Sequence, residues 1–585
     1  MRAVSLTAVL LLLAVPGLPG SGHAQEVAIV DLEVSFLDEH VVGEFSNLGS
    51  GFIGDHNPAN PPADRIDPLH PRSWKWWRNV HRPYSYAGER FQHGLGSKWT
   101  SQYNPGHDCG HPGGPCSFPG TFRDFCEAEA ASMLAQGMNP RWDFWGEPGW
   151  PGVGGEYPFL SAADYASWLR ECALGLREAY DEHPTFTRED LTLIAPSLWK
   201  WNDIYRVMFT QGSAGCTVLQ GDEFFGASFD CDAGEPAPFG LLAFLDTYRD
   251  DLQVDLVSAH QFNDYMVQFW PWLFQALEEA LDAETAARGL DPMEISVNEY
   301  IGPSYNLCAE PAGVHPDSPS CLDPIHEREN FLRPGHTVKG LAALHSGSVE
   351  SAVKACWTDP TTGLSGCNEK ALNGLLVGDT TMAKRPVWHV YRLYGELTGH
   401  EISQSAVSST YSGGGVFDPL GAVATRDDTL TEGSYKILVG YSNLMYQPGL
   451  EIPDNDVYES FRGPYRTTNQ VTVSTRLVGL DPDCDSATVF TTEISGTDFI
   501  SPMPSVTRVD RGAYAISEGT LVFDAILDKN DALLIEFESF SGGSRCLTDL
   551  DGDGQSDPVA DPIEWIFDDS FETGDTSSWS LPAGR

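Results

Sequence analysis

Apolar positions in the middle of the chain alternate between helical spacing and short continuous runs. Between residues 122 and 138 they recur at helical spacing, and an apolar run over residues 141–145 follows a helix stop that ends in Asn139 and Pro140. Further along, the pattern predicts helices over residues 161–176, 239–248, 270–288, 337–344 and 387–397, and strands over residues 191–197, 254–260, 295–301 and 351–357.

Alternating helices and strands are typical of βα units around a parallel sheet, in the α/β class. The number of units favours a (β/α)8 TIM barrel over an open sheet, and we assign it residues 25–400. Residues 25–125 are rich in Pro, Gly, His and Trp, so we expect short strands joined by long loops there.

The pattern of apolar and polar residues changes after Gly399. Short alternating runs over residues 435–441, 470–475, 487–490 and 532–537, separated by Gly, Asp and Pro, indicate an antiparallel β-sandwich, which we place at residues 401–540. Residues 541–585 are rich in Gly, Ser and Asp and are expected to form an acidic tail.

The first residues resemble an export signal. Arg2 supplies a positive charge, residues 6–15 an apolar run, and Gly22 and Ala24 the small residues before a cleavage site, so residues 1–24 are predicted to be a signal peptide. Because the apolar run is too short to span a bilayer, we expect a secreted or periplasmic protein without membrane insertion.

The net charge narrows the class of binding partner. Asp and Glu total 83 against 35 Lys and Arg, a net charge of −48, which disfavours nucleic acid and anionic membranes as partners.

The twelve cysteines indicate disulfides in an exported chain, with proximity favouring the pairs Cys109/Cys116, Cys216/Cys231, Cys308/Cys321 and Cys356/Cys367. A zinc site around residues 107–111 is the alternative for the first pair.

Two glutamates stand where predicted strands end. Glu147 follows an aromatic-rich strand and precedes Pro148, and Glu299 ends a β-branched run before Tyr300. In a barrel these glutamates would close strands four and seven, at the end where barrel enzymes carry their active sites. Retaining glycosidases need such a pair, an acid/base and a nucleophile about 5–5.5 Å apart. A surface or salt-bridged carboxylate is the alternative for either residue alone.

The motifs around both glutamates resemble those of a known group. The segment from Trp145 to Pro148 resembles the acid/base motif of clan A retaining glycoside hydrolases, and residues 297–300 resemble their nucleophile strand. The order of elements is most similar to glycoside hydrolase family 39, the β-xylosidases and α-iduronidases. This resemblance implies double displacement with Glu147 as acid/base and Glu299 as nucleophile, and no cofactor for catalysis.

The sequence departs from the clan at two positions. The clan has Asn before the acid/base glutamate, where this chain has Gly146, and Asn202 is a candidate to replace it. Phe262 stands where the strand-six pattern leads us to expect Tyr, and Tyr265 is the candidate substitute. The candidate substrate contacts are Trp145, Asn202, His260, Tyr265, Tyr300 and Trp357. Core packing is the alternative for His260 and Trp357.

The tail carries a candidate calcium loop. Oxygen-bearing side chains alternate around Gly552, as in short aspartate loops that bind Ca²⁺. The candidate ligands are Asp549, Asp551, Asp553 and Asp557. Position twelve is Ala560 instead of Glu, which argues against a full EF-hand, and a solvated acidic linker is the alternative.

Two functions of different class fit these observations. The first is a secreted retaining glycosidase acting on β-linked oligo- or polysaccharide. The second is a non-catalytic carbohydrate-binding surface protein on a decayed barrel, a hypothesis motivated by Gly146 and the acidic tail. The presence of both glutamates favours the enzyme, because a binding protein does not need a matched acid and nucleophile.

Overall fold

The computed structural model describes the parts of the chain that build its sheets and the helices packed on them. The described residues are 28–53, 63–70, 73–76, 90–94, 121–144, 162–198, 245, 254–261, 270–300, 332–346, 349–355, 372–378, 381–411, 420–427, 434–442, 470–480 and 484–541. The predicted signal peptide lies outside these residues, as does the predicted acidic tail beyond its first residue, Ser541.

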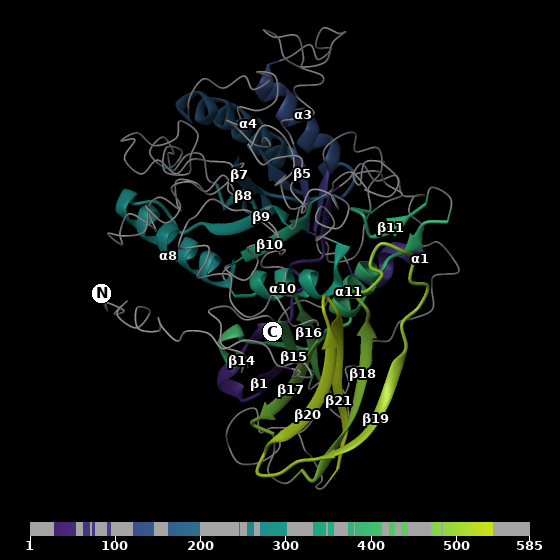
Figure 1. Cartoon of the computed structure of the whole chain (residues 1–585). Coiled ribbons are helices and arrows are strands. Elements are labelled where there is room, and N and C mark those ends of the chain that lie inside the picture. Colours follow the sequence, from purple (N-terminus) through teal and green to yellow (C-terminus); the bar gives the residue numbers. More distant parts are fainter. Residues whose placement is uncertain are drawn as a thin grey trace, which may run out of the picture.

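Eight parallel strands pair into a closed barrel (Figure 1). In ring order they are β3 (Gly51–Ile53), β4 (Ser73–Trp76), β5 (Arg90–Gly94), β6 (Arg141–Asp143), β7 (Thr192–Leu198), β8 (Leu256–Gln261), β9 (Glu294–Tyr300) and β10 (Val349–Lys354). Ring order follows sequence order, so β6 and β9 are the fourth and seventh strands. The parallel sheet predicted from the sequence is confirmed.

The helices between these strands match the hydrophobic pattern where they are described. They are α3 (Phe122–Leu134), α4 (Ala162–Glu182), α8 (Trp270–Arg288), α10 (Pro334–Leu344) and α11 (Pro386–Gly395). The bounds of α8 are those that the pattern predicted. The helix predicted over residues 239–248 lies outside the described residues except at Leu245, so a complete (β/α)8 repeat stays a prediction.

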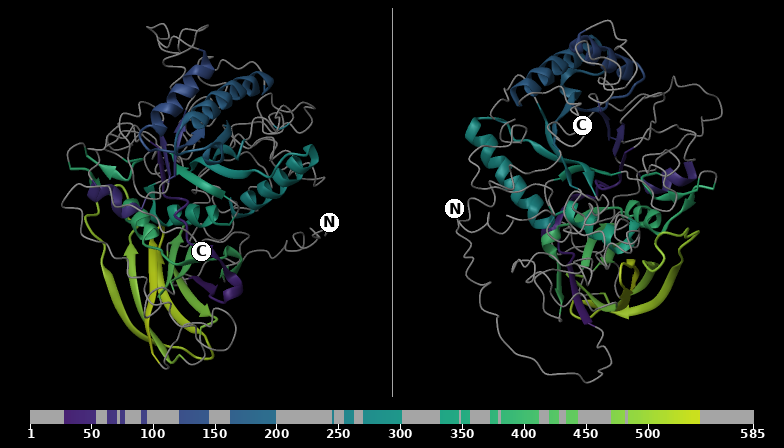
Figure 2. Two further views of the ribbon diagram at one scale, coloured as in Figure 1. Left: turned by 180° about the vertical axis from the view of Figure 1, so that it is seen from behind. Right: turned by 45° about the horizontal axis from the view of Figure 1, so that its top comes forward.

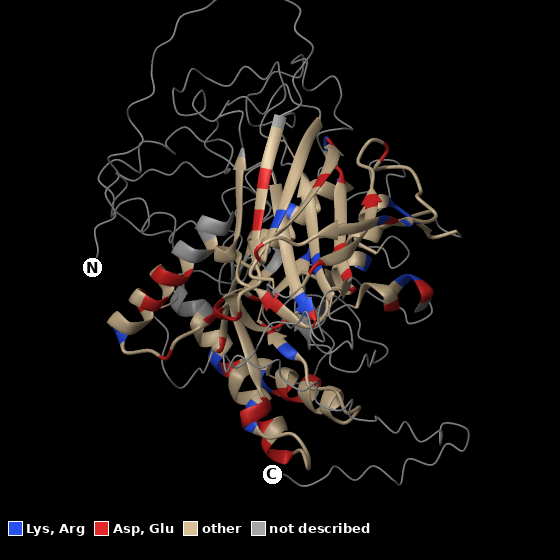
Figure 3. Cartoon of the chain, turned by 90° about the horizontal axis from the view of Figure 1, so that it is seen from below, with Lys and Arg blue, Asp and Glu red and all other residues tan. Residues whose placement is uncertain are grey.

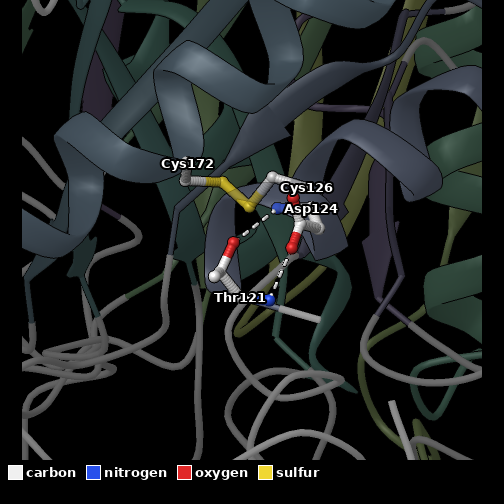
Figure 4. The surroundings of a disulfide bond; sticks show 4 residues. All are labelled: Thr121, Asp124, Cys126 and Cys172. Atoms are coloured by element: carbon white, nitrogen blue, oxygen red, sulfur yellow. Dashed lines mark hydrogen bonds between the residues drawn. A yellow bond between two sulfur atoms is a disulfide. The ribbon is translucent and has the colours of Figure 1, made fainter. Parts of the chain in front are cut away.

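A disulfide joins α3 to α4. Cys126 and Cys172 are bonded, and both side chains are fully buried (Figure 4). The helix α3 begins at a capping box, in which the Thr121 hydroxyl accepts from the Asp124 N–H and the Asp124 carboxylate accepts from the Thr121 N–H. Sequence proximity had left these two cysteines without an assigned partner. The third described cysteine, Cys484, is also in a disulfide.

Two further sheets form a second unit with its own core. One contains β14 (Val407–Tyr411), β1 (Ala28–Ser35), β17 (Gln470–Val478) and β20 (Leu521–Asp528) in that order. The other contains β19 (Arg508–Ala515), β18 (Ser486–Ile494), β21 (Ala532–Ser541), β16 (Ser434–Tyr441), β15 (Leu420–Asp427), β13 (His400–Ile402) and β2 (Val41–Glu44). Alternate side chains from both sheets meet in one apolar cluster, as facing sheets require.

The N-terminal strands belong to this second unit, which the division at residues 25 and 400 does not anticipate. Strand β1 pairs in parallel with β17, and β2 pairs with β13. The buried Val30, Leu32 and Val34 alternate with polar residues along β1, so the strand needs one covered face. The strand β17 beside it lies more than 400 residues further along the chain, and the apolar cluster that β1 joins comes from both sheets, beyond the reach of local sequence patterns.

Helix α10 lies between the barrel and the seven-stranded sheet, with α11 beside it (Figures 1 and 2). Every residue of α10 is buried. The helix backbone approaches the sheet through glycines, because a Cβ on Gly440 would lie 2.5 Å from the Gly335 oxygen and one on Gly421 would lie 2.5 Å from the Lys339 Cα. This close contact joins the two units.

Short elements complete the described chain. They are the helix α1 (Ala63–Ile66), the hairpin strands β11 (Leu376–Val377) and β12 (Ala383–Lys384), and the 3-10 turns η2 (Asp38–His40), η3 (Asp67–Leu69), η4 (Arg188–Asp190) and η10 (Gln404–Ala406). Asp and Glu occur along both helices and strands, shown in red in Figure 3. None of the helices among the described residues is long and apolar enough to cross a membrane.

Candidate active site

The strand before Glu147 is anchored on its outer side. Trp142 of β6 donates its Nε1–H to the Tyr180 hydroxyl of α4 at 3.0 Å, so the indole points away from the barrel axis. Because successive strand residues face opposite sides, Arg141 and Asp143 face the interior, where Asp143 is 1% exposed. The strand ends at Asp143, and Trp145, Gly146 and Glu147 lie just beyond Phe144, outside the described residues.

The strand that carries Glu299 is described along its backbone. Glu299 is the penultimate residue of β9, and its backbone pairs with His260 of β8. All eight strands are parallel, so the C-terminal ends of β6 and β9 open at the same end of the barrel. The positions that follow the fourth and seventh strands are therefore at the end where barrel active sites form.

His260 lies one residue before the C-terminal end of β8 and is 1% exposed. Its backbone pairing places it beside Glu299 on the neighbouring strand. The two alternatives drawn from the sequence, a substrate contact and a packed core histidine, both require a position at this strand end. The burial of the ring favours a role in packing or in orienting its neighbours.

The structure contradicts the prediction that Tyr300 contacts the substrate. Its side chain is fully buried, and its hydroxyl donates to the Gly49 carbonyl oxygen and lies 2.7 Å from the Tyr391 hydroxyl of α11. The ring therefore faces the helices outside the barrel and is not a substrate contact. Its place in the sequence, next to Glu299, suggested a sugar contact, but strand alternation sends neighbouring residues to opposite faces.

Charged groups that the sequence did not single out lie at the other end of the barrel. Arg141, the first residue of β6, forms two hydrogen bonds with the carboxylate of Glu350 near the start of β10. The nearby Asp255 accepts from the Leu193 N–H at 2.7 Å. Burial raises the pKa of Asp255, and Glu294 adds to the rise while the Leu193 N–H and Arg141 oppose it. These groups line the N-terminal end of the barrel, whose residues typically contribute to stability and not to catalysis.

Several predicted residues fall outside the described ranges. They are the candidate sugar contacts Asn202, Tyr265 and Trp357 and the candidate calcium ligands Asp549, Asp551, Asp553 and Asp557. Within the described ranges, no three His, Cys, Asp or Glu side chains gather closely enough to hold a metal ion.

The fold has counterparts among solved structures, although no protein-family model and no curated protein matches the sequence. A glucosidase from Croceicoccus marinus aligns with a TM-score of 0.52 at 12% identity, over 88% of this chain and 100% of its own. N2152 from Neocallimastix frontalis aligns with a TM-score of 0.50 at 14% identity, over 87% of this chain and 99% of its own. A GH39 enzyme from Xanthomonas axonopodis pv. citri aligns with a TM-score of 0.45 at 11% identity, over 87% and 97% of the two chains. At these identities the likeness is one of fold alone.

Proposed function

We propose that this protein is a secreted retaining glycoside hydrolase that cleaves β-glycosidic bonds in oligo- or polysaccharides. One observation carries the proposal. Glu299 occupies the penultimate position of the seventh strand of a closed parallel barrel, and Glu147 follows the fourth strand by four residues. Two carboxylates attached to those strands can flank one sugar at the barrel mouth.

The proposed reaction is a double displacement. The Glu299 carboxylate attacks the anomeric carbon while Glu147 gives its proton to the departing glycosidic oxygen, so the C–O bond breaks as a glycosyl ester forms. Glu147, now a carboxylate, then takes a proton from water. The hydroxide equivalent attacks the anomeric carbon, breaks its bond to the Glu299 oxygen, releases the Glu299 carboxylate and leaves the sugar with its original anomeric configuration.

The surroundings favour a saccharide in an oxidising compartment. Cys126 and Cys172 form a disulfide, and disulfides persist in exported proteins. The net charge of −48 favours a neutral or cationic saccharide over a polyanionic one. We further propose that Trp145, Asn202, Tyr265 and Trp357 contact the sugar, with a xylosidase-like specificity as the leading choice. Calcium at the tail aspartates would be structural.

The experiment is hydrolysis of a panel of aryl β-glycosides and polysaccharides by the full-length protein, with product anomers followed by NMR. The variants Glu147→Ala and Glu299→Gln are measured beside the wild type. We expect turnover with retained configuration in the wild type and loss of turnover in both variants, with sugar binding kept by Glu299→Gln. Inverted products would contradict the double displacement.

A carbohydrate-binding protein on the same fold is the second candidate, and Gly146 is the observation that favours it. The clan uses Asn at that position to contact the sugar 2-hydroxyl, and Gly has no side chain to replace it. Binding of saccharides without turnover of any of them, in the wild type and both variants alike, would support this candidate and contradict the first.

A further inference from the structure

A buried hydroxyl pair fixes the C-terminal end of β9. The hydroxyl of Tyr300, the residue after Glu299, donates its proton to the Gly49 carbonyl oxygen. The Tyr300 hydroxyl oxygen also lies 2.7 Å from the Tyr391 hydroxyl of α11. A phenol has one proton to give, so Tyr391 is the donor in this second contact. Both rings are fully buried.

The Gly49 peptide is held from its other side as well. Its N–H donates to the Tyr394 hydroxyl at 3.3 Å, and that hydroxyl lies 2.6 Å from His345 Nε2. His345 Nδ1 lies 2.8 Å from the Glu401 carboxylate. A carboxylate can only accept, so Nδ1 carries the proton. A chain of hydrogen bonds, joined through the backbone of Gly49, thus runs from Glu401 to Tyr300.

This chain connects the two units of the fold. Glu401 belongs to β13 of the seven-stranded sheet, whereas Tyr300 belongs to the barrel. The members are packed closely: Phe45 stacks on His345 with 5.5 Å between ring centroids and an interplanar angle of 17°. A Cβ on Gly49 would lie 2.3 Å from Leu341 Cδ2, so a side chain there would require Leu341 to shift.

Burial keeps the hydroxyls protonated. It raises the pKa of Tyr300 well above its ordinary value, and it raises the pKa of Tyr391 as well. Both tyrosines therefore remain donors across any working pH. The backbone adds further restraint. The Ala355 N–H donates to the backbone carbonyl oxygen of Tyr300 at 2.9 Å, and the Ala352 N–H donates to that of Leu48 at 3.1 Å.

We propose that this hydrogen-bonded chain, from Glu401 through His345, Tyr394 and Gly49 to Tyr300, positions the strand end that carries Glu299. Tyr300 is then a positioning residue that acts through the peptide it shares with Glu299. The inference rests on the proposed function, in which Glu299 is the nucleophile. Catalysis depends on nucleophile placement to within about 0.5 Å, so a fixed neighbour contributes to rate without touching the sugar.

The test compares Tyr300→Phe with Tyr435→Phe in the full-length protein. Each change deletes one hydroxyl from a fully buried ring, but Tyr435 lies on β16 in the core of the second unit. We expect Tyr300→Phe to lower kcat about tenfold or more with KM nearly unchanged, and to slow labelling of the nucleophile by a 2-fluoro glycoside. Tyr435→Phe should lower only the Tm. Amide hydrogen exchange over residues 294–300 should be faster in Tyr300→Phe alone.

A second variant tests the remote end of the chain. Glu401→Ala removes the carboxylate from His345 and should lower kcat in the same direction, whereas Glu401→Gln, which keeps an acceptor oxygen, should restore most of the rate. Since the residues act as one chain, the effect of the double variant with Tyr300→Phe should be smaller than the product of the two single effects.

The outcomes separate this inference from the proposed function. An active wild type with equal kcat in Tyr300→Phe and Tyr435→Phe would overturn the positioning role and leave the glycosidase standing. A wild type that turns over no glycoside would overturn the proposed function and the inference together.

Discussion

Arg141 of β6 and Glu350 of β10 form an ion pair across the interior of the barrel. The two strands are the fourth and eighth of the ring, so they lie on opposite walls. The pair is doubly hydrogen-bonded, and the side chains are 9% and 12% exposed. It therefore ties opposite walls together at the end of the barrel away from the candidate active site.

Breaking this pair should destabilise the barrel. Glu350→Leu leaves the Arg141 charge buried without its carboxylate, which costs about 3–5 kcal/mol when a buried pair loses one partner. The double variant with Arg141→Met removes both charges and should recover most of that loss. The measurement is the Tm by calorimetry. The control is Asp181→Asn, which breaks an exposed pair with Arg188 and should leave the Tm unchanged. Equal losses in Glu350→Leu and the double variant would contradict the argument.

The Cys126–Cys172 disulfide should stabilise the segment that carries Glu147. The bond closes a loop with a sequence separation of 46, and β6 and Glu147 lie inside it. Replacing Cys126 and Cys172 together by Ala should cost about 2–4 kcal/mol, mainly because the unfolded chain gains freedom. Proteolysis between α3 and α4 should become faster. A Tm that is unchanged in the double variant and in the reduced wild type would show that the bond contributes nothing.

The sequence predicted the helices and strands whose pattern lies within a single short segment of the chain. The bounds of α8 follow from helical spacing of its apolar residues, and the apolar, β-branched stretch before Glu299 predicted β9. The pairing of β1 with β17 is not local, and neither is the bond between Cys126 and Cys172. Such contacts are decided by packing of distant segments. No spacing rule could have found them.

The candidate site shows the same limit. The two glutamates were proposed because a strand end followed by a turn is visible in the sequence. Tyr300 was misassigned because its partners Gly49 and Tyr391 lie 251 and 91 residues away. The Arg141–Glu350 pair was missed for the same reason, since the two residues are 209 positions apart.

His389 should make stability depend on pH. Its Nε2 lies 2.7 Å from the Met503 oxygen, and burial lowers its pKa from its ordinary value to about 4. In the unfolded chain the ring binds a proton below about pH 6.5. Between pH 6.5 and 4 the unfolded state therefore holds more protons, so this contribution to stability, about 3 kcal/mol in all, is lost as the pH falls through that window.

A variant isolates this contribution from others. Burial lowers the pKa of His336 as well, which acts in the same direction, whereas burial raises the pKa of Asp531 to about 6, which stabilises the fold as the pH falls below that value. We therefore compare the wild type with His389→Gln, which keeps a donor for the Met503 oxygen. The difference in Tm between them should shrink from pH 7 to pH 4.5. Parallel Tm curves would contradict the assignment.

Glu147→Ala should affect substrates according to their leaving groups. Under the proposed mechanism, Glu147 protonates the departing oxygen, which accelerates the reaction of a poor leaving group about 10²–10⁴-fold. An aryl glycoside with a strongly acidic phenol needs no proton, so its glycosyl ester on Glu299 should form at nearly the normal rate and accumulate. Azide attacks that ester without a general base and should restore turnover, giving a glycosyl azide of retained configuration.

The matched control for this prediction is Glu294→Gln. Glu294 is an exposed carboxylate at the start of β9, at the opposite end of the barrel strand from Glu299, and its variant should keep full activity on both kinds of substrate. Equal losses for good and poor leaving groups in Glu147→Ala, with no response to azide, would show that Glu147 does not transfer the proton. The acid would then have to come from another residue at the C-terminal ends of the strands, because an enzyme of this mechanism cannot expel a poor leaving group unprotonated.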